Sequence, residues 1–403
     1  MSEETGSTET CPEQEALNEE QTIAATENAA NSPRNDVIRD TKCRNIDGAA
    51  SGNVLDGRRA KITRRRFLAG SMAASLLPLN YASAQRVEED GLVIRKQGSF
   101  FVGGQKIFAN VNDGIVPPNP ALGGFGPGHI ILNQAYVQFQ IPANLKFKYP
   151  IFLTHGGGHH GAFYEATPDG RDGWYTHFAR KGFAVYIVDD VNRGRSGYDI
   201  QDIDSVALGL EPVTAIPRIN KYSQERAWTA FRIGPTFLVP YPGSRFPVEA
   251  FDQYSAQLVP AWRNPIETDR NVAAFVALFD QVGPAVLVTW SQSGLFGWRT
   301  ALQRPQLVKA IVGLEPGLPD LSTAGNLEVL ATIPILWVIA DHNQAGVDSA
   351  KAAASTLRGA GGKADVLALP EAGIVGNSHV MVIEKNNLEI ADLIIERLEE
   401  MLS

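Results

Sequence analysis

The chain of 403 residues is 44% hydrophobic, 20% charged and 8% aromatic, and this composition excludes a chain that is disordered over its whole length. Its net charge of -8, from 36 Lys and Arg against 44 Asp and Glu, argues against nucleic acid or an anionic membrane as the main partner. The two cysteines, Cys11 and Cys43, exclude a disulfide-rich scaffold and any zinc or iron–sulfur site made of cysteines.

The first 84 residues differ in composition from the rest of the chain. Residues 1–62 are polar and lack helical or strand periodicity, so we expect a disordered N-terminal extension. Residues 63–84 join Arg64-Arg65-Arg66 to a short apolar run and to Ala82-Ser83-Ala84, which is typical of a twin-arginine export signal. A short membrane anchor or a chance basic cluster is the alternative, although the run is shorter than the roughly 20 residues that span a membrane.

Cleavage after Ala84 predicts a mature domain over residues 85–403 that the twin-arginine export machinery delivers to the periplasm or the cell exterior. This domain contains no cysteine and no second apolar segment long enough to span a membrane. Its short apolar runs alternate with stretches of helical spacing. In chain order we expect a hairpin over 86–112 turning at Gly103-Gly104, a loop over 113–129, strands over 135–141 and 149–154, a helix over 172–181, a strand over 183–188, an irregular insertion over 199–265, a helix over 268–280, a strand over 285–289, a helix over 294–303, strands over 310–314 and 335–340, a helix over 349–358, a strand over 364–369 and a helix over 388–402.

Buried strands that alternate with helices predict an α/β fold with a mostly parallel central sheet and helices on both of its faces. The hairpin over 86–112 and the strand over 135–141 would add N-terminal antiparallel strands at one edge of the sheet. Residues 199–265 interrupt the alternation, and an insertion of this length in a compact domain predicts a lid or cap. Its large aromatic residues would either line an apolar pocket or pack the insertion onto the core; they are Tyr222, Trp228, Phe231, Phe237, Tyr241 and Trp262.

One serine stands where a buried strand is expected to turn sharply into a helix. Small residues two positions before and after Ser291 (Thr289 and Ser293) permit the tight turn that exposes a nucleophilic serine, although glycines are usual there. Ser293 as the nucleophile would place Leu295 at the second small position, so Ser291 is preferred. The alternative is a serine-rich helix cap without a catalytic role.

A serine hydroxyl needs a base to take its proton, and the base needs an acid to orient it. With the order serine, acid, histidine, only His342 and His379 follow Ser291, and the loop expected to carry His379, between the last strand and the last helix, can reach the turn. Glu315 and Asp341 both stand at predicted strand ends. Position alone favours Asp341, and either residue could equally be a capping carboxylate.

The run His155-Gly156-Gly157-Gly158 follows the strand expected beside that of Ser291. Its glycines let backbone N–H groups approach a developing oxyanion, and the N–H of Gln292 would be the second donor. A simple turn is the alternative, and a phosphate loop is excluded because no Gly-Lys-Ser/Thr sequence follows. His155, His159 and His160 have the spacing of a metal site, but no carboxylate nearby completes one, so we expect no metal.

Several motifs occur together, and with them the chain resembles secreted bacterial carboxylesterases of the α/β-hydrolase superfamily over roughly residues 95–403. They are the His155–Gly158 run, Thr167-Pro168-Asp169-Gly170-Arg171-Asp172-Gly173-Trp174, Arg193-Gly194-Arg195-Ser196-Gly197, Trp290-Ser291-Gln292-Ser293-Gly294, Leu314-Glu315-Pro316 and Gly376-Asn377-Ser378-His379. The resemblance implies Glu315 as the acid in place of Asp341, and oxyanion donors at Gly157 and Gln292. Some relatives carry two adjacent cysteines where this chain has Gly157-Gly158.

The resemblance therefore implies a secreted serine hydrolase that cleaves carboxylic esters through an acyl-enzyme, with Ser291 as nucleophile, His379 as base and Glu315 as acid. It implies no cofactor and no metal, a small-molecule ester as the substrate, and it is compatible with a homodimer. Lactone or amide hydrolysis on the same triad is an alternative. A second alternative is a binding protein that has kept the fold without catalysis.

Overall fold

The computed structural model describes residues 91–109, 128–207, 209–216, 218–262 and 266–403. All of them belong to one compact unit, Leu76–Ser403. The N-terminal extension predicted over residues 1–62 and the export signal predicted over 63–84 lie outside the described residues, as does most of the loop predicted over 113–129.

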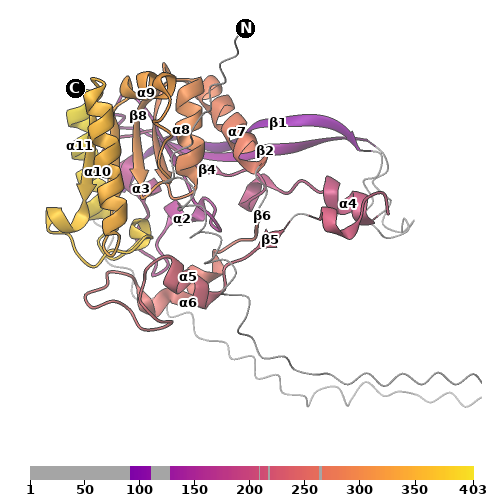
Figure 1. The fold of residues 1–403 in the computed structure, drawn as a ribbon, viewed down its shortest axis with the longest axis horizontal. Helices are drawn as coiled ribbons and strands as arrows, with labels where there is room; N and C mark the ends of the chain where they lie inside the picture. The colour runs from indigo at the N-terminus through magenta and orange to yellow at the C-terminus, as the bar shows by residue number, and fades with distance from the viewer. Residues whose placement is uncertain (1–90, 110–127, 208, 217, 263–265) are drawn as a thin grey trace, which may run out of the picture. The chain divides into compact units, whose positions relative to one another are not determined.

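The described part of the chain contains one large sheet of eight strands (Figure 1) in the order β1-β2-β4-β3-β7-β8-β9-β10. The first pairings, β1 with β2 and β2 with β4, are antiparallel, and the remaining pairs are parallel. This confirms the predicted mostly parallel sheet with antiparallel strands at one edge. The strands are β1 Ile94–Ala109, β2 Gly128–Pro142, β3 Ile151–Thr154, β4 Val185–Asp189, β7 Ala285–Trp290, β8 Val308–Leu314, β9 Ile335–Ile339 and β10 Ala364–Ala368.

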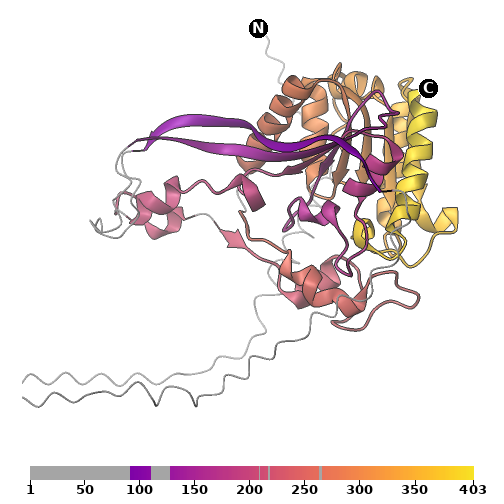
Figure 2. The same cartoon turned by 180° about the vertical axis from the view of Figure 1, so that it is seen from behind.

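Helices cover both faces of this sheet, as the views in Figures 1 and 2 show. One face packs against α3 and α11, and the other packs against α7, α8, α9 and α10. The arrangement confirms the α/β-hydrolase fold expected from the sequence. The helices are α2 Ala162–Glu165, α3 Trp174–Lys181, α7 Ile266–Val282, α8 Ser293–Gln303, α9 Ala324–Ala331, α10 Gln344–Gly359 and α11 Asn387–Leu402; α2 and α9 were not predicted.

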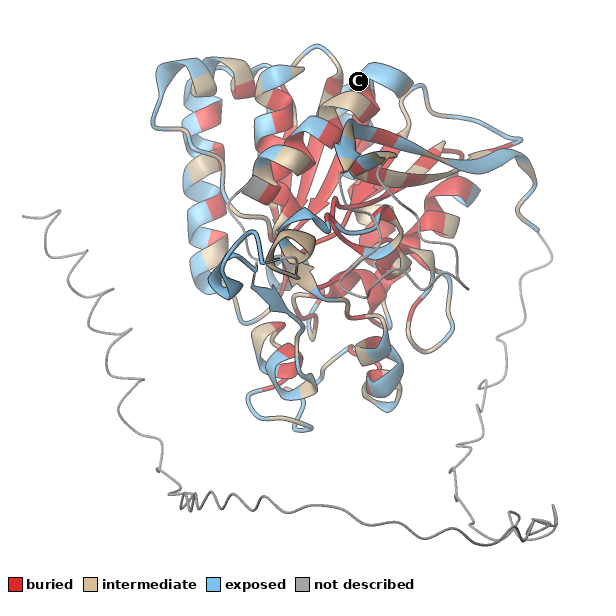
Figure 3. Cartoon of the chain, turned by 90° about the vertical axis from the view of Figure 1, so that its right-hand side faces the viewer, coloured by how far each residue is buried: buried red, intermediate tan, exposed pale blue. Residues whose placement is uncertain are grey.

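The central strands have no solvent-facing side, because side chains from both of their faces enter a core. Along β3, Ile151 and Leu153 join the core under α3 and α11, whereas Phe152 between them joins the core under α7 and α8. Figure 3 shows buried residues gathered in the central strands and on the inner faces of the surrounding helices. Successive side chains of a strand point to opposite faces, so a continuous apolar run is what a strand covered on both sides requires.

The prediction of a hairpin that turns at Gly103-Gly104 is wrong. Strand β1 continues through both glycines and pairs along its whole length with β2. Gly103 and Gly104 adopt φ angles of 65° and 78°, and Asn133 on the facing strand has φ 63°, so the glycines distort the ladder without reversing it. A Cβ on Gly103 would lie 3.1 Å from Cα of Ala274; the glycine allows α7 to pass close to the strand.

Residues 199–262 form a region of short elements rather than of regular strands and helices. It includes two short strands paired with each other and a cluster of helices that are labelled α5 and α6 in Figure 1. The elements are α4 Gln201–Ala207, η2 Val213–Ala215, β5 Ile219–Asn220, α5 Gln224–Ala230, η3 Val248–Ala250, α6 Phe251–Ala256 and β6 Ala261–Trp262. Over the described residues, no helix has the length and apolar character needed to cross a membrane.

Candidate active site

Ser291 lies on the turn between β7 and α8, at the carboxyl edge of the sheet. Its backbone has a φ of 55°, in the left-handed region that is costly for any residue with a Cβ. The turn is held by the N–H of Ser291, which donates to the carbonyl of Leu314 at 3.0 Å. Its neighbours must be small, since a Cβ on Gly156 would lie 2.8 Å from Cβ of Ser291 and one on Gly294 would lie 2.3 Å from Cβ of Pro316. This is the strained strand-to-helix geometry of a nucleophile turn.

Ser293, the other serine of the motif, is fully buried. Its Oγ accepts a hydrogen bond from the N–H of Trp290 at 3.0 Å and lies 3.1 Å from both Oγ1 and the carbonyl of Thr154. These bonds join the end of β7 to the end of β3, so the hydroxyl of Ser293 is used in holding the two strands.

The structure brings His379 and Glu315 together. Nδ1 of His379 is hydrogen-bonded to Oε2 of Glu315, and donation from Nδ1 leaves Nε2 of the neutral ring as an acceptor. Oε1 of Glu315 also accepts from the N–H of Ala340 at 3.0 Å and from Nδ2 of Asn343 at 3.2 Å, and Arg232 Nη2 lies 2.5 Å from each carboxylate oxygen. The acid is therefore buried but fully supplied with donors.

These contacts decide the charge of Glu315. Burial alone would raise the pKa of this carboxyl, but the hydrogen bond and charge of His379, followed by the charge of Arg232, lower the pKa to about 2. Glu315 is thus an anion throughout the neutral range, as the orienting acid of a histidine must be.

Asp341, the acid favoured by position alone, has other partners. Its carboxylate accepts from the N–H of Asn377 at 3.1 Å, and its own N–H donates to the carbonyl of Asn377 at 3.1 Å. Asp341 therefore fastens the base of the loop that carries His379, while the contact with the imidazole belongs to Glu315.

His379 is fixed to the residue before Ser291 and to the 199–262 region. The indole N–H of Trp290 donates to the carbonyl of His379 at 2.7 Å, and the N–H of His379 donates to the carbonyl of Phe231 at 3.0 Å. The ring of Phe231 stacks on the imidazole, with centroids 5.8 Å apart and planes 10° apart. The histidine is consequently held from two sides, by the serine turn and by the end of α5.

The loop before His379 is folded around a second buried carboxylate. Glu384 accepts from the N–H of Ser378 at 2.8 Å and from Nδ2 of Asn377 at 2.6 Å. Burial raises the pKa of Glu384 to about 7, in spite of these donors. The Thr167–Trp174 motif supports the same segment, because the Arg171 guanidinium donates to the carbonyls of Ile383 and Glu384 at 3.2 and 3.0 Å.

The His155–Gly158 run packs against the serine turn. A Cβ on Gly157 would lie 3.2 Å from Oε1 of Gln292, so the two predicted oxyanion donors belong to neighbouring residues. The N–H of Asp190 donates to Nε2 of His155 at 2.9 Å, which places the proton of His155 on Nδ1, 3.0 Å from the carbonyl of Gly156. Burial lowers the pKa of His155 to about 3, so the ring is a neutral support of this run.

Arg193, to which sequence analysis assigned no role, joins the two segments that carry the predicted oxyanion donors, Gly157 and Gln292. Its Nη1 donates to the carbonyl of Gly156 at 3.2 Å and its Nη2 donates to Oε1 of Gln292 at 2.9 Å. The guanidinium is buried beside Asp190 and Glu267, at 3.4 and 3.7 Å. The only sequence signal was its place at the head of the Arg193–Gly197 motif.

His159, the second residue of the candidate metal spacing, is also a neutral support. Its Nδ1 lies 3.0 Å from the carbonyl of Gly157 and its Nε2 lies 3.0 Å from the hydroxyl of Tyr254, while burial lowers its pKa to about 3. Among the residues that the structure describes, no group of three or more His, Cys, Asp or Glu side chains is arranged to hold a metal ion.

Two proteins are similar to this chain over most of their length. The chain is 32% identical over 319 residues to a probable secreted lipase, phiG, from Fungal sp. (strain ATCC 74256), covering 64% of this chain and 84% of the relative. It matches the atomic-resolution structure of a novel bacterial esterase with a TM-score of 0.72 and 34% identity, covering 79% of this chain and all of that one. No family model matches the chain. The chain belongs to the esterases and lipases of the α/β-hydrolase superfamily.

This α/β-hydrolase is accordingly a carboxylic-ester hydrolase. Its 199–262 region lies directly against the glycine run. A Cβ on Gly158 would lie 2.6 Å from the ring of Tyr222, and the N–H of Val259 donates to the carbonyl of Gly158 at 2.9 Å. The region therefore touches the site at three places, which are the glycine run, His379 and Glu315.

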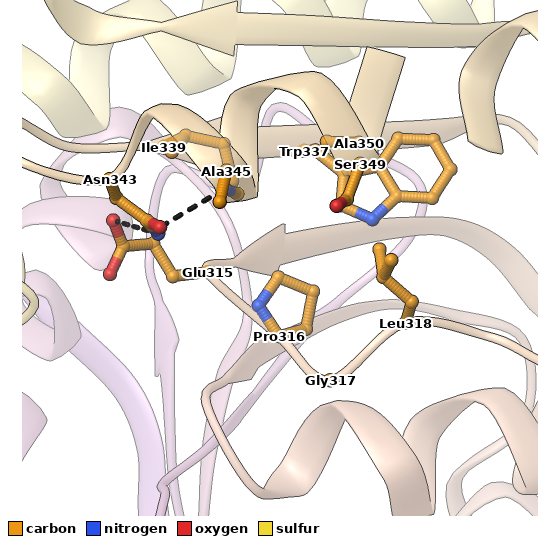
Figure 4. A pocket seen from close by; sticks show the side chains of 11 residues that line it. Glu315, Pro316, Gly317, Leu318, Trp337, Ile339, Asn343, Ala345, Ser349 and Ala350 are labelled. Atoms are coloured by element: carbon orange, nitrogen blue, oxygen red, sulfur yellow. Dashed lines mark hydrogen bonds between the residues drawn. The ribbon is translucent and has the colours of Figure 1, made fainter. Parts of the chain in front are cut away.

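A cavity of about 340 Å³ borders the acid (Figure 4). Glu315 and Asn343 stand at one end of it and Trp337 at the other, and its lining comes from the segment after β8, from β9 and from α10. A volume of about 340 Å³ is large enough for several water molecules, and the cavity lies beside the carboxylate that contacts His379.

Proposed function

We propose that this hydrolase cleaves carboxylic esters with Ser291 as nucleophile, His379 as base and Glu315 as acid. The observation that carries the proposal is the pairing of His379 Nδ1 with the buried Glu315 carboxylate, on a loop fastened to Trp290 immediately before the strained Ser291. A serine turn, an orienting carboxylate and a histidine, in this chain order, are the parts that acyl transfer needs.

In the first step Oγ of Ser291 attacks the ester carbonyl, and Nε2 of His379 takes the hydroxyl proton. The imidazolium is stabilised by Glu315 and then protonates the departing alcohol as the tetrahedral intermediate collapses to the acyl-enzyme. In the second step the same histidine deprotonates a water molecule, which attacks the acyl carbon. The carboxylic acid product then leaves, and the histidine returns the proton to Oγ of Ser291.

The backbone N–H groups of Gly157 and Gln292 are the proposed donors to the oxyanion of both intermediates. Gln292 precedes the first turn of α8, so its N–H belongs to the group of donors left free at a helix start. Arg193 supports the arrangement, since it joins the carbonyl of Gly156 to the side chain of Gln292. Preorganised donors of this kind are usually the largest single contribution to catalysis.

We further propose that the 85–403 domain works after export, with residues 199–265 as a lid over the site. The twin-arginine pattern at residues 63–84 and the printed name of the fungal relative, a probable secreted lipase, support export. Contacts of Tyr222, Phe231 and Arg232 with the site support the lid.

Substitution of Ser291 by alanine tests the mechanism. We expect kcat for p-nitrophenyl esters to fall by about 10⁴-fold or more, because the members of a triad act as a unit. A fluorophosphonate probe should label the wild-type enzyme once, at Ser291, and should not label the variant. Ser293→Ala is the matched control for fold: it should lower the unfolding midpoint but leave the labelling site at Ser291. Wild-type activity in Ser291→Ala would refute the proposal.

A further inference from the structure

The guanidinium of Arg232, which comes from a different part of the chain, lies against the carboxylate of Glu315. Its Nη2 lies 2.5 Å from both carboxylate oxygens of Glu315, and its Nε donates to the carbonyl of Asp341 at 3.3 Å. The residues Arg232 and Glu315 are 83 positions apart. The Arg232 side chain is 22% exposed and the Glu315 side chain is 3% exposed, so solvent screens this ion pair only weakly.

The backbone at Arg232 is one that usually requires glycine. After α5, the N–H of Arg232 donates to the carbonyl of Thr229 at 3.1 Å and the N–H of Ile233 donates to that of Trp228 at 3.0 Å. These two bonds form a Schellman helix end, whose left-handed position is commonly glycine. Here it is Arg232, with φ 57°. Strain at a non-glycine residue in contact with a candidate site points to a role for its side chain.

We propose that Arg232 is a positioning residue of the ester hydrolase, and that its charge on Glu315 sets the pH at which His379 becomes available as a base. This inference rests on the proposed triad. Glu315 stabilises the protonated form of His379, and a cation bound to the same carboxylate weakens that stabilisation. Arg232 thus favours the neutral imidazole that catalysis needs, and extends the working range of the enzyme to lower pH.

The other charged or titratable groups around Glu315 and His379 do not supply the positive charge that Arg232 supplies. Glu384 on the loop side carries a raised pKa of about 7 because of burial, and His159 on the side of the glycine run has its pKa lowered to about 3 by burial. Asp341 lies next to the Arg232–Glu315 ion pair, but its carboxylate accepts a hydrogen bond from the N–H of Asn377. Of the groups in the described residues that face Glu315 and His379, Arg232 is the one that brings a permanent positive charge.

The pH dependence of fluorophosphonate labelling tests the inference without a substrate. In this reaction Oγ of Ser291 bonds to phosphorus, fluoride leaves and the hydroxyl proton passes to His379, so the rate follows the neutral histidine. We expect the acid limb of the rate profile to move up by about one pH unit in Arg232→Gly and Arg232→Met. Arg232→Lys, which keeps the charge, should stay near the wild-type midpoint.

Two comparisons make the result decisive. Arg232→Gly relieves the strain of the left-handed backbone and Arg232→Met keeps it, while both remove the ion pair, so a shift of the midpoint that is common to both variants cannot be attributed to the backbone. Arg226→Met removes an exposed cation from the same helix and should leave the midpoint unchanged. A lower rate with an unmoved midpoint in the Gly and Met variants, or equal shifts in Lys and Met, would overturn the inference. Failure of the wild type to label at Ser291 would instead refute the proposed triad.

Discussion

At the scale of single residues, three of the seven non-glycine residues with positive φ in the described part of the chain lie at the proposed site. Arg232, Ser291 and Glu315 have φ angles of 57°, 55° and 42°, where a residue with a side chain costs about 1–2 kcal/mol. Each of them directs a polar group into the site from the end of a different element: α5, β7 and β8. The packing around Gly156, Gly294 and Gly313, where a Cβ would lie within 3 Å of a neighbour, is what holds such turns in place.

Replacing either candidate acid by its amide distinguishes their roles. Glu315→Gln keeps the shape of the side chain but removes the charge that orients and stabilises the histidine, so kcat/KM should fall by about 10³–10⁴-fold. Asp341→Asn loosens only the hydrogen bond that the side chain accepts from the N–H of Asn377, so it should lower kcat/KM by less than about tenfold. Steady-state kinetics on one ester at one pH are sufficient for this comparison.

Thermal unfolding of the two amide variants serves as the control. Because Asp341 fastens a loop, its variant should lose stability without a comparable loss of activity per folded molecule. A larger loss of kcat/KM in Asp341→Asn than in Glu315→Gln would assign the acid to Asp341 and contradict the geometry described above.

The sequence could predict some of these residues and not others. Ser291 and His379 follow from local signals, namely small residues at a strand-to-helix turn and a histidine in the last loop. The choice of Glu315 over Asp341 needed the family resemblance, since both acids end a strand. Arg232 lies in an insertion with poor periodicity, and its contact with Glu315 crosses 83 positions, so no pattern in the residues around it points to the site.

At the scale of elements, the parallel strands and most of their helices were predictable because each is a buried apolar run or an amphipathic stretch with clear ends, whereas the eight-residue α9 was not predicted. The helix over 172–181, for example, was predicted to end at Gly182, and α3 ends there with a left-handed glycine, φ 104°. The turn at Gly103-Gly104 was mispredicted since two glycines also permit a distorted strand. The pairing partner of β1 then follows residues 110–127, which no short-range turn rule addresses.

The contact between Tyr222 and Gly158 predicts that the substitution Gly158→Ala disturbs both the insertion and catalysis. In Gly158→Ala the new Cβ would lie 2.6 Å from the Tyr222 ring at a φ of 74°, so the ring, or the insertion that carries it, must shift away from the glycine run. We expect kcat/KM to fall by about tenfold or more, together with an earlier unfolding midpoint, because small displacements of oxyanion donors are costly to catalysis.

Gly170→Ala is the matched control for this change. Gly170 has a similar φ of 84° and open space where its Cβ would lie, so this variant incurs the backbone strain without the clash. It should lose about 1 kcal/mol of stability and keep its activity. Equal kinetic losses in both alanine variants would show that backbone strain alone, and not the contact with Tyr222, explains the effect.

At the scale of the whole molecule, the hydrolase buries several carboxyl groups that do not contact His379. Burial raises the pKa of Asp190 to about 8 and those of Glu267 and Glu384 to about 7. Asp190 and Glu267 share one guanidinium, that of Arg193. Within the described residues, Oδ1 of Asp190 and Oε1 of Glu267 receive no hydrogen bond. The charges of Arg193, between the two acids, and of Arg270, near Glu267, do not offset burial, so a proton stays bound in the core near neutral pH.

This predicts that the protein loses stability as the pH rises from 6.5 to 8.5. The folded state holds protons on Asp190, Glu267 and Glu384 that the unfolded chain has already released, so raising the pH favours unfolding. His155 and His159, with folded pKa values of about 3, are neutral in the folded state, whereas an ordinary histidine in the unfolded chain is about half protonated at pH 6.5. Each of them therefore opposes the trend by about 0.4 kcal/mol between pH 6.5 and 8.5. One pKa unit corresponds to about 1.4 kcal/mol, so the total loss should be about 3 kcal/mol.

Urea unfolding at the two pH values measures this loss directly. Asp190→Asn removes the group with the largest shift, keeps an oxygen for Arg193 and should reduce the difference between the midpoints by about half. Asp280→Asn removes a carboxylate from the exposed pair with Arg304, which is ionised throughout this range, so the difference should equal that of the wild type. A wild-type midpoint that is constant or rises between pH 6.5 and 8.5 would mean that Asp190 and Glu267 are both ionised in the core. Arg193 would then be paired with two ionised carboxylates while it joins Gly156 to Gln292. The segments that carry the proposed oxyanion donors would in that case be positioned by three charged side chains, those of Arg193, Asp190 and Glu267.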